Sequence, residues 1–491
     1  METRARQRSG RTARLLGAAG ALGLAGLAQA APPPIAIPVS AEDSAASSAN
    51  EGLFDFLQGW RRSGALLGDM WGARTLLSRH GVSLGVQETS EGLGNLTGGS
   101  RRGFDYEGLT QAVVQLNTQR AFGWYGGTLN ISALQIHGRN LSAETLGSLQ
   151  TASGIEADRG ARLWEIWYDQ KLLDQDRLDL RVGQQSLDQE FMVSSNALSF
   201  VNTMFGWPMV PSEDLPGGGP AYPLSALGLR VKARPTDAVA VLAGVFSGSP
   251  AKTLSGDPQR DNRYGLGFPL NRGALAIAEI QYAYPALGGM VSPGDSQPLA
   301  RTYRLGVWYD TERFVDERYD AHGRPLASAL SDGTAAQHRG NYSVYAVADQ
   351  MVWRSGRDPN RTLSLFTRIM GTPEADRNLV DFSANLGFVL RDPLTYRTAD
   401  TFGVGLGYAH VSRRVAGADR DAALASGAYT PVRSDETFVE ATYQYPFTPW
   451  LQLQPDVQYV FNPGGGVANP NNPQSRTRNE LVLGVRTNIL F

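Results

Sequence analysis

Apolar residues recur at every second position over most of the chain after Gly81. In the C-terminal segment, Leu481, Leu483, Val485, Thr487, Ile489 and Phe491 share one face, and Val482, Gly484, Arg486, Asn488 and Leu490 share the other. Side chains alternate between faces along a β-strand, so a period of two predicts strands with one apolar and one polar face. A β-sandwich shows the same alternation, and the period alone does not distinguish it from a membrane barrel.

The number and length of the alternating segments separate these two folds. Sixteen segments begin near residues 82, 109, 127, 162, 177, 225, 238, 273, 301, 341, 361, 379, 401, 434, 451 and 480. Many run about 9–12 residues, the length of a tilted strand that crosses a bilayer, whereas sandwich strands average about 5–6. The sequence therefore predicts an all-β fold, a 16-stranded antiparallel transmembrane β-barrel with an even strand number, as in single-chain bacterial barrels.

The connections between the expected strands alternate in length. With a periplasmic N-terminus, those after odd strands face outside and span about 19, 24, 39, 26, 30, 8, 21 and 18 residues, and those after even strands about 9, 6, 3, 16, 6, 10 and 5. Aromatic residues such as Tyr282, Tyr284 and Phe461 lie near strand ends on the apolar face, as in interfacial girdles. A sheet can cross hydrocarbon only when it is closed, and a barrel of this size leaves an aqueous channel.

The N-terminal residues have a different character. Five arginines before residue 15, an apolar run from Leu15 to Ala28 and the triplet Ala28-Gln29-Ala30 predict a signal peptide over residues 1–30. Residues 31–58 are rich in Ala, Pro and Ser and predict a flexible segment. Residues 59–81 are expected to form a short periplasmic helical segment, with a helix over 68–80 that Asp69 caps and Gly81 ends. Residues 82–491 are expected to form the barrel domain.

Composition excludes several kinds of site. The chain has no Cys, which excludes disulfides and thiolate metal sites, and its formal net charge of −2 does not favour nucleic-acid binding. The five His show no metal-ligand spacing, so neither a metal nor another cofactor is expected. The sequence GVGLG at 403–407 lies within an expected strand and does not open a helix, which argues against a nucleotide-binding loop. No later segment is apolar for the about 18 residues that a membrane helix needs.

Several short sequence motifs follow one another along the chain: GDMWGARTLLSRHGVSLGV (68–86), NLTGG (95–99), FGWYGGTL (122–129), LWEIWYDQ (163–170), LDLRVGQQ (178–185), YPLSALGLRV (222–231), LQLQPDVQYVFNPGG (451–465) and LVLGVRTNILF (481–491). In these motifs the chain resembles the OprB-type carbohydrate-selective porins. The resemblance implies an outer-membrane porin of a Gram-negative bacterium that passes monosaccharides such as glucose by passive diffusion and is not an enzyme. It also implies three partners: sugars in transit, outer-membrane lipid with lipopolysaccharide, and the barrel-assembly machinery, which would read the terminal Phe491.

Charged residues within the expected strands predict the inner face. A charge on the lipid face costs roughly 2–4 kcal/mol at the bilayer midplane, so ionised strand residues should point into the lumen. Arg donates and Asp and Glu accept hydrogen bonds, and sugar hydroxyls do both. The pore lining is predicted to include Glu165, Asp169, Arg181, Arg230, Lys232, Glu279, Arg304, Arg368, Asp381, Glu440, Asp456 and Arg486. The orientation of Asp349 stays open, because both faces of 341–354 carry apolar residues. The lining charges could instead only hydrate and brace the lumen through mutual ion pairs.

The connection 186–224 is the longest and the most aromatic. It follows the fifth strand, the place of the constriction loop in sixteen-stranded porins by analogy, and its apolar groups need cover. It is therefore predicted to be a third extracellular loop that folds inward and narrows the channel. Its candidate residues are Phe191, Phe200, Phe205, Trp207, Glu213 and Asp214, and Glu190 could supply a further acceptor. The rings could stack on a sugar or only anchor the loop.

Three other functions remain as alternatives to a sugar-preferring channel. The nearest is a general porin without solute preference. A barrel hydrolase would need a Ser–His pair at the rim, and an adhesin would show no conductance. The sequence leaves open which saccharide passes and whether the barrel is a monomer or a homotrimer.

Overall fold

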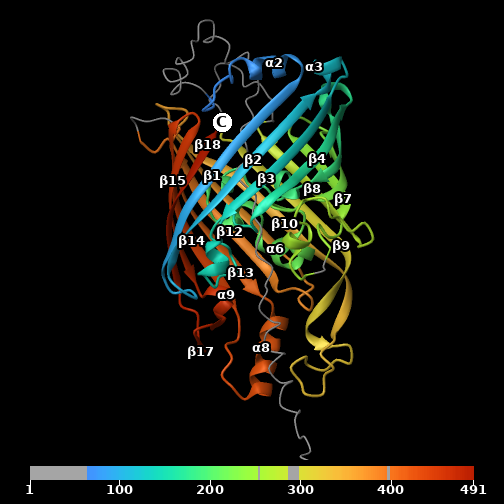
Figure 1. Cartoon of the computed structure of the whole chain (residues 1–491), viewed down its shortest axis with the longest axis vertical. Helices are drawn as coiled ribbons and strands as arrows, with labels where there is room; N and C mark the ends of the chain where they lie inside the picture. The colour runs from blue at the N-terminus through green and yellow to red at the C-terminus, as the bar shows by residue number, and fades with distance from the viewer. Residues whose placement is uncertain (1–63, 253–254, 286–297, 395–398) are drawn as a thin grey trace, which may run out of the picture.

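The computed structural model describes residues 64–252, 255–285, 298–394 and 399–491. Within these residues, sixteen antiparallel strands pair edge to edge and the last strand pairs with the first, which closes a barrel (Figure 1). The barrel strands are β1 Val82–Thr97, β2 Gly103–Asn117, β3 Gly127–Gly138, β4 Gly160–Leu172, β5 Leu178–Gln185, β6 Ala226–Ala233, β7 Val239–Ser247, β8 Ala274–Tyr284, β9 Arg301–Asp320, β10 Ala335–Arg354, β11 Thr362–Gly371, β12 Val380–Arg391, β13 Thr401–Val411, β14 Asp435–Thr448, β15 Leu451–Phe461 and β18 Glu480–Leu490. The 16-stranded antiparallel barrel that the sequence predicts is confirmed.

Helices and one small extra sheet lie in the connections. The helices are α2 Ala73–Arg79, α3 Thr118–Phe122, α4 Leu141–Glu144, α5 Thr203–Gly206, α6 Met209–Asp214, α7 Pro258–Asp261, α8 Arg413–Ser426 and α9 Pro463–Gly466. The strands β16 Ala468–Asn469 and β17 Asn472–Arg476 form a two-stranded sheet in the last loop. Figure 1 shows α2, α3 and the C-terminus at one end of the barrel, and α8, α9 and β17 at the other. We name these the turn end and the loop end. No helix in the described part of the chain is long and apolar enough to cross a membrane.

The barrel is apolar on its outer surface. In β9, Leu305 on the outer face is 60% exposed, whereas Trp308, three residues further on and on the inner face, is 1% exposed. The same exposed apolar face continues around the wall with Val182, Leu229, Val245, Ile280, Leu365, Leu386, Val457 and Val485. Polar side chains are buried on the inner side, which is the reverse of a water-soluble β-sandwich. An apolar exterior of this kind fits a bilayer as its surroundings.

Two loop-end connections are shorter than the sequence predicts. Residues 98–102 join β1 to β2, and residues 321–334 join β9 to β10, because the strands themselves continue further. Both β9 and β10 have 20 residues. Backbone pairing continues through polar segments beyond the apolar band, where alternation no longer marks a strand. The second and tenth strands accordingly begin at Gly103 and Ala335, ahead of the predicted starts near 109 and 341.

The N-terminal helix is shorter than expected. It begins at Ala73, because Met70, Trp71 and Gly72 adopt positive φ angles. Asp69 still serves the first turn, since its carboxylate accepts the Thr75 main-chain N–H at 2.9 Å and the Thr75 hydroxyl at 2.9 Å. Gly81, with φ of 77°, follows the end of the helix as predicted. The expected signal peptide (1–30), the segment 31–58 and residues 59–63 lie outside the described residues.

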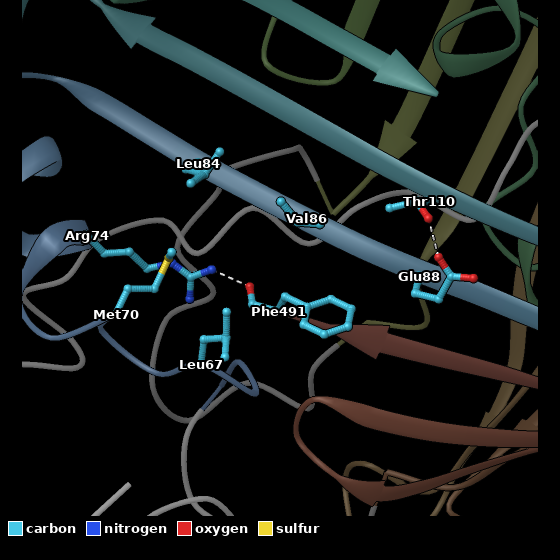
Figure 2. A pocket seen from close by; sticks show the side chains of 8 residues that line it. All are labelled: Leu67, Met70, Arg74, Leu84, Val86, Glu88, Thr110 and Phe491. Carbon is cyan, nitrogen blue, oxygen red and sulfur yellow. Dashed lines mark hydrogen bonds between the residues drawn. The ribbon is translucent and has the colours of Figure 1, made fainter. Parts of the chain in front are cut away.

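The segment before β1 covers the seam where the barrel closes. Leu66 donates its main-chain N–H to the Leu490 carbonyl at 2.8 Å, and Phe491 donates to the Val86 carbonyl at 2.9 Å. Arg74 of α2 donates to the main-chain oxygen of Phe491 (Figure 2). It also donates to the Gly68 carbonyl. A cavity of about 350 Å³ lies beside these groups. Its strand residues, including Val86, belong to the outward face, so this cavity is separate from the lumen.

Candidate functional site

The connection 186–225 fills much of the barrel interior. Nearly all of its residues are buried, including α5 and α6, and α6 packs against β12. The inward fold of this third loop-end connection confirms that part of the fold prediction. What remains open to solutes is therefore set by this loop and by the wall that faces it.

Wall carboxylates bind the backbone of the loop. Asp349 accepts the Asn196 main-chain N–H at 3.2 Å and the Ser194 hydroxyl at 2.7 Å, so it points inward, which answers the question that the sequence left open. Glu440 accepts the main-chain N–H groups of Val201 at 2.6 Å and Asn202 at 2.9 Å. These carboxylates replace water for loop donors that would otherwise be buried without a partner.

Wall arginines bind the loop carbonyls. Arg368 is 1% exposed and donates to the main-chain oxygens of Met192 at 2.9 Å, Gly206 at 3.0 Å and Met204. Arg486 donates to the Val201 carbonyl at 3.3 Å and is paired with Glu91. Both arginines lie on the inner face, as predicted, but beneath the loop. Their guanidinium groups hold the loop in place and are not accessible to a solute.

The loop aromatics are anchors in the structure. Phe191, Phe200, Phe205 and Trp207 are each at most 4% exposed, so their rings offer no free face to a passing sugar. The ring of Phe205 lies 4.4 Å from that of Phe200 and 5.4 Å from that of Phe438, centroid to centroid. Of the two roles that the sequence left open for these rings, the geometry favours the anchoring one.

The GVGLG segment of β13 makes room for these rings. A Cβ atom placed on Gly403 would lie 2.7 Å from the Phe200 ring, and one on Gly405 would lie 2.5 Å from the Phe205 ring. On Gly407 it would lie 2.0 Å from Phe438. Gly403 and Gly405 therefore allow close approach of the loop to the wall, and Gly407 allows close approach of a neighbouring wall strand, which is a packing role and not a phosphate-binding one.

A second loop-end connection, 139–159, also folds inward, and the sequence did not predict this. Glu436 accepts the main-chain N–H groups of Leu149 at 2.7 Å and Gln150 at 2.8 Å. Gln458 donates to the Ala152 carbonyl at 2.8 Å. The segment is rich in small and hydroxyl-bearing residues and has no aromatic ring, so it lacked the apolar signal that marked the third loop.

A collar of charged side chains lies on the inner wall of β4, β5 and β6. Arg181 binds Asp169 at 3.0 Å and Glu190 of the third loop at 3.4 Å. Arg230 binds Asp169 at 3.2 Å and Glu190 at 2.7 Å, and it is also paired with Asp179. The side chains of Arg181, Asp179 and Glu190 are 18–20% exposed, so solvent reaches them. We call Asp169, Asp179, Arg181, Glu190, Arg230 and Lys232 the charged collar.

A second ion pair extends the polar wall toward β8 and β9. Arg304, with its side chain 14% exposed, lies 3.5 Å from Glu279 and donates to the Glu190 carbonyl at 3.2 Å. Glu279 also accepts the Tyr345 hydroxyl and the Met192 main-chain N–H, both at 2.8 Å. The Nε of Arg304 has no hydrogen-bond partner among the described residues. The pair therefore combines a buried acceptor with a guanidinium group that is partly exposed.

The remaining predicted residues are dispersed. Glu165 accepts the Ser186 main-chain N–H at 2.9 Å, and Asp456 accepts a hydrogen bond from Gln458 at 2.9 Å. On α6, burial and the nearby carboxylates of Glu436 and Glu317 raise the pKa of Glu213 to about 8. Burial also raises the pKa of Asp214, whose carboxylate accepts the Val380 main-chain N–H at 3.3 Å.

Asp381 does not line the lumen, which corrects the prediction for this residue. The register shifts between Val380 and Phe382, so the residue between them leaves the inward phase. Its carboxylate lies 2.6 Å from Nδ1 of His410, whose strand neighbours Ala409 and Val411 are the buried, inward ones. A β-bulge of this kind re-aims a side chain without leaving a mark in the sequence pattern.

A cluster at the loop end brings together one His and two Asp from separate segments. The ligand atoms of Asp316, His338 and Asp376 lie within 4.8 Å of one another. Arg414 binds Asp316 through two hydrogen bonds, and Arg377 lies 2.8 Å from Asp376. Both carboxylates therefore already have cationic partners. The sequence could not have identified this cluster, because its members are distant along the chain.

Comparison with known proteins identifies the family. The model of the carbohydrate-selective porin, OprB family, matches residues 101–491. The chain belongs to this family. It is 26% identical to Porin B of Pseudomonas aeruginosa over 443 residues, which cover 87% of this chain and 91% of that protein. The high-pH structure of Pseudomonas putida OprB matches with a TM-score of 0.74 at 26% identity, covering 87% of this chain and 99% of that one.

A more distant relative is the putative porin QuiX of Acinetobacter baylyi, 24% identical over 82% of this chain and 89% of that protein. Membership of this porin family, together with the closed barrel, places the chain in the outer membrane of a Gram-negative bacterium. Its turn end is then periplasmic and its loop end extracellular, as in other such barrels. The chain is an outer-membrane channel for small hydrophilic solutes of the carbohydrate class.

Proposed function

We propose that monosaccharide-sized sugars cross this porin along the charged collar and the Glu279–Arg304 pair. The observation that carries the proposal is the arrangement of these groups. Guanidinium and carboxylate groups alternate on the inner wall beside the third loop, and Arg181, Glu190 and Arg304 keep 14–20% of their side chains exposed to solvent. A sugar hydroxyl can accept from the first and donate to the second at the same time.

Charge balance within the collar favours neutral solutes. Arg181, Arg230 and Lys232 stand against Asp169, Asp179 and Glu190, so no large field of one sign selects cations or anions. Five of these groups (Asp169, Asp179, Arg181, Glu190 and Arg230) already have ionic partners, so a solute can only share their hydrogen bonds. Contacts of this kind are weak enough to permit release, which conduction requires.

Liposome swelling tests the preference for sugars. Proteoliposomes are compared in glucose and in a zwitterionic amino acid of similar size, and we expect faster swelling in glucose. In Arg304→Gln the advantage of glucose should fall by about fivefold, as expected for the loss of one hydrogen bond worth about 1 kcal/mol. Arg357→Gln, an exposed arginine in the turn between β10 and β11, is the matched control. Equal rates for both solutes in the wild type would indicate a general porin instead.

Two partner interactions are part of the proposal. Association into a homotrimer would be visible as a crosslinked species of three chains in native membranes. Recognition of Phe491 by the barrel-assembly machinery would make its replacement slow outer-membrane assembly. The second is supported by the place of Phe491 at the end of the closing strand β18, in the outward phase.

A further inference from the structure

A cationic cavity opens on the outer surface of the barrel at the loop end. Its volume is about 590 Å³, and it is formed by the residues before β8, by β9 and by β10. Its polar groups come from Asn271, Arg272, Thr311, Arg313, Gln337 and Arg339. One carboxylate, that of Glu312, also borders it, so three guanidinium groups face a single acid.

The phase of the strands places this cavity outside the barrel. Arg313 and Arg339 are exposed, whereas Phe314, next to Arg313, is buried. Toward the turn end, the same outward face of β9 carries Tyr309, Val307 and Leu305, which are 42–60% exposed. The three arginines therefore lie at the extracellular edge of the apolar band, directly beyond an interfacial tyrosine.

Two of the three arginines lie next to each other on adjacent strands, so their positive charges repel. Arg313 and Arg339 are direct cross-strand partners, an arrangement in which like charges are destabilising. Among the described residues, no ion pair or side-chain hydrogen bond joins the guanidinium group of Arg272, Arg313 or Arg339 to a partner. An anion bound between them would relieve this repulsion.

Neighbouring arginines at the same end differ in this respect. Arg318 is paired with Asp421 at 2.6 Å, Arg414 with Asp316 at 2.5 Å, and Arg433 with Asp419 at 2.8 Å. The chain thus supplies a carboxylate for each of these three arginines, but not for those of the outer cavity. What distinguishes the outer cavity is that three such guanidinium groups gather around one carboxylate, so an anion could bind all three at once.

We propose that the cavity binds the phosphate groups of lipopolysaccharide in the outer leaflet. The lipid A part of this lipid carries phosphates where the hydrocarbon ends, which is the depth of the three arginines. Guanidinium forks bind phosphate oxygens through paired hydrogen bonds, and Thr311, Gln337 and Asn271 can donate further ones. The proposal rests on the extracellular position of the loop end and is independent of which solute the channel passes.

Binding of lipid A to the purified barrel tests the proposal. The full-length protein in detergent is titrated with phosphorylated lipid A, and separately with lipid A from which the phosphates have been removed, and bound lipid is measured by native mass spectrometry. We expect tighter binding of the phosphorylated form. Arg313→Gln combined with Arg339→Gln should weaken it by about ten- to a hundredfold, the effect of losing one or two charged hydrogen bonds of about 1.5–3 kcal/mol.

Controls separate specific binding from general attraction. Arg357→Gln removes the same charge at the periplasmic end and should leave lipid A binding unchanged. Folding of each variant is checked by its mobility on gels without heating, and glucose swelling should equal that of the wild type. Equal affinity of the wild type for both lipids would overturn the proposal, as would an unchanged affinity of a folded double variant. A loss of sugar preference without a loss of lipid binding would count against the transport proposal alone.

Discussion

At the scale of single residues, burial decides what an arginine of the inner wall does. Arg368 is 1% exposed and donates its hydrogen bonds to loop carbonyls. Arg181 has 18% of its side chain exposed, shares Asp169 and Glu190 with Arg230, and lies 3.9 Å from the centre of the Trp167 ring. Both have the same phase in the sequence. Only the second can respond to a solute or an ion.

Replacing Arg181 should therefore change ion selectivity and leave folding intact. In Arg181→Ala, Asp169 and Glu190 keep Arg230 as a partner but lose one positive charge, so the lumen becomes more negative. We expect the reversal potential in a salt gradient across planar bilayers to shift toward cation selectivity, with Arg357→Ala unchanged. A failure of Arg181→Ala to assemble in the membrane would contradict the assignment of this residue to a hydrated wall.

At the scale of elements, the third loop is held by its backbone and not by its side chains alone. Wall carboxylates accept its N–H groups and wall arginines bind its carbonyls, so a loop of irregular structure can be buried without unpaired backbone groups. The side chains of helix α6 are less well satisfied, because Oε1 of Glu213 and Oδ2 of Asp214 are buried without a hydrogen-bond partner among the described residues. The docking of α6 should consequently be the part of the loop that depends on pH.

The pKa of Glu213 determines whether docking of the loop strengthens or weakens as the pH rises. Burial raises its pKa from 4.5 to about 8, so the docked loop holds a proton that the undocked loop releases. Docking is then strongest below about pH 4.5 and weakens as the pH rises toward about 8. We expect protease cleavage within 186–225 of the folded barrel to increase over this interval and Glu213→Gln to flatten the increase. The control Glu144→Gln, in the other inward loop, should behave as the wild type; a wild-type loop with no pH response would refute the argument.

At the scale of the whole molecule, the barrel is closed where its two ends meet. β18 pairs with both β1 and β15, and the segment before β1 reaches across the seam through Leu66 and Arg74. Closure satisfies every strand edge, which is what allows a sheet to remain in hydrocarbon.

Two measurements on denaturing gels follow from closure. The unheated protein should migrate faster than the heated one, because a closed barrel resists the detergent until it is boiled. Arg74→Ala removes the hydrogen bond to Phe491 and should lower the temperature of this conversion, corresponding to about 1 kcal/mol. Arg79→Ala, on the same helix but exposed, should leave the conversion temperature unchanged. Identical mobility before and after heating would speak against a closed barrel.

The strand pattern was readable because lipid and water impose opposite demands on the two faces of each strand. This is why the sixteen segments and the inward direction of Glu279, Arg304 and Glu440 could be predicted. The inward fold of the third loop could be predicted because its aromatic residues need cover from water. The pattern no longer predicts strands outside the bilayer, where neither face of a strand has to be apolar. It gave no sign of the long extensions of β9 and β10 beyond the bilayer, nor of the bulge that turns Asp381 away from the lumen.

The sequence by itself determined the barrel, its strand number and the polar character of its interior, because these follow from local alternation and from the cost of charge in hydrocarbon. Only the tertiary structure decided which of the inward charges face a solute. Arg368, Glu440 and Arg486 lie beneath the third loop, whereas Arg181 and Arg304 stand beside it, and the second inward loop is held by Glu436. These outcomes depend on contacts between residues far apart in the chain, which no local pattern encodes.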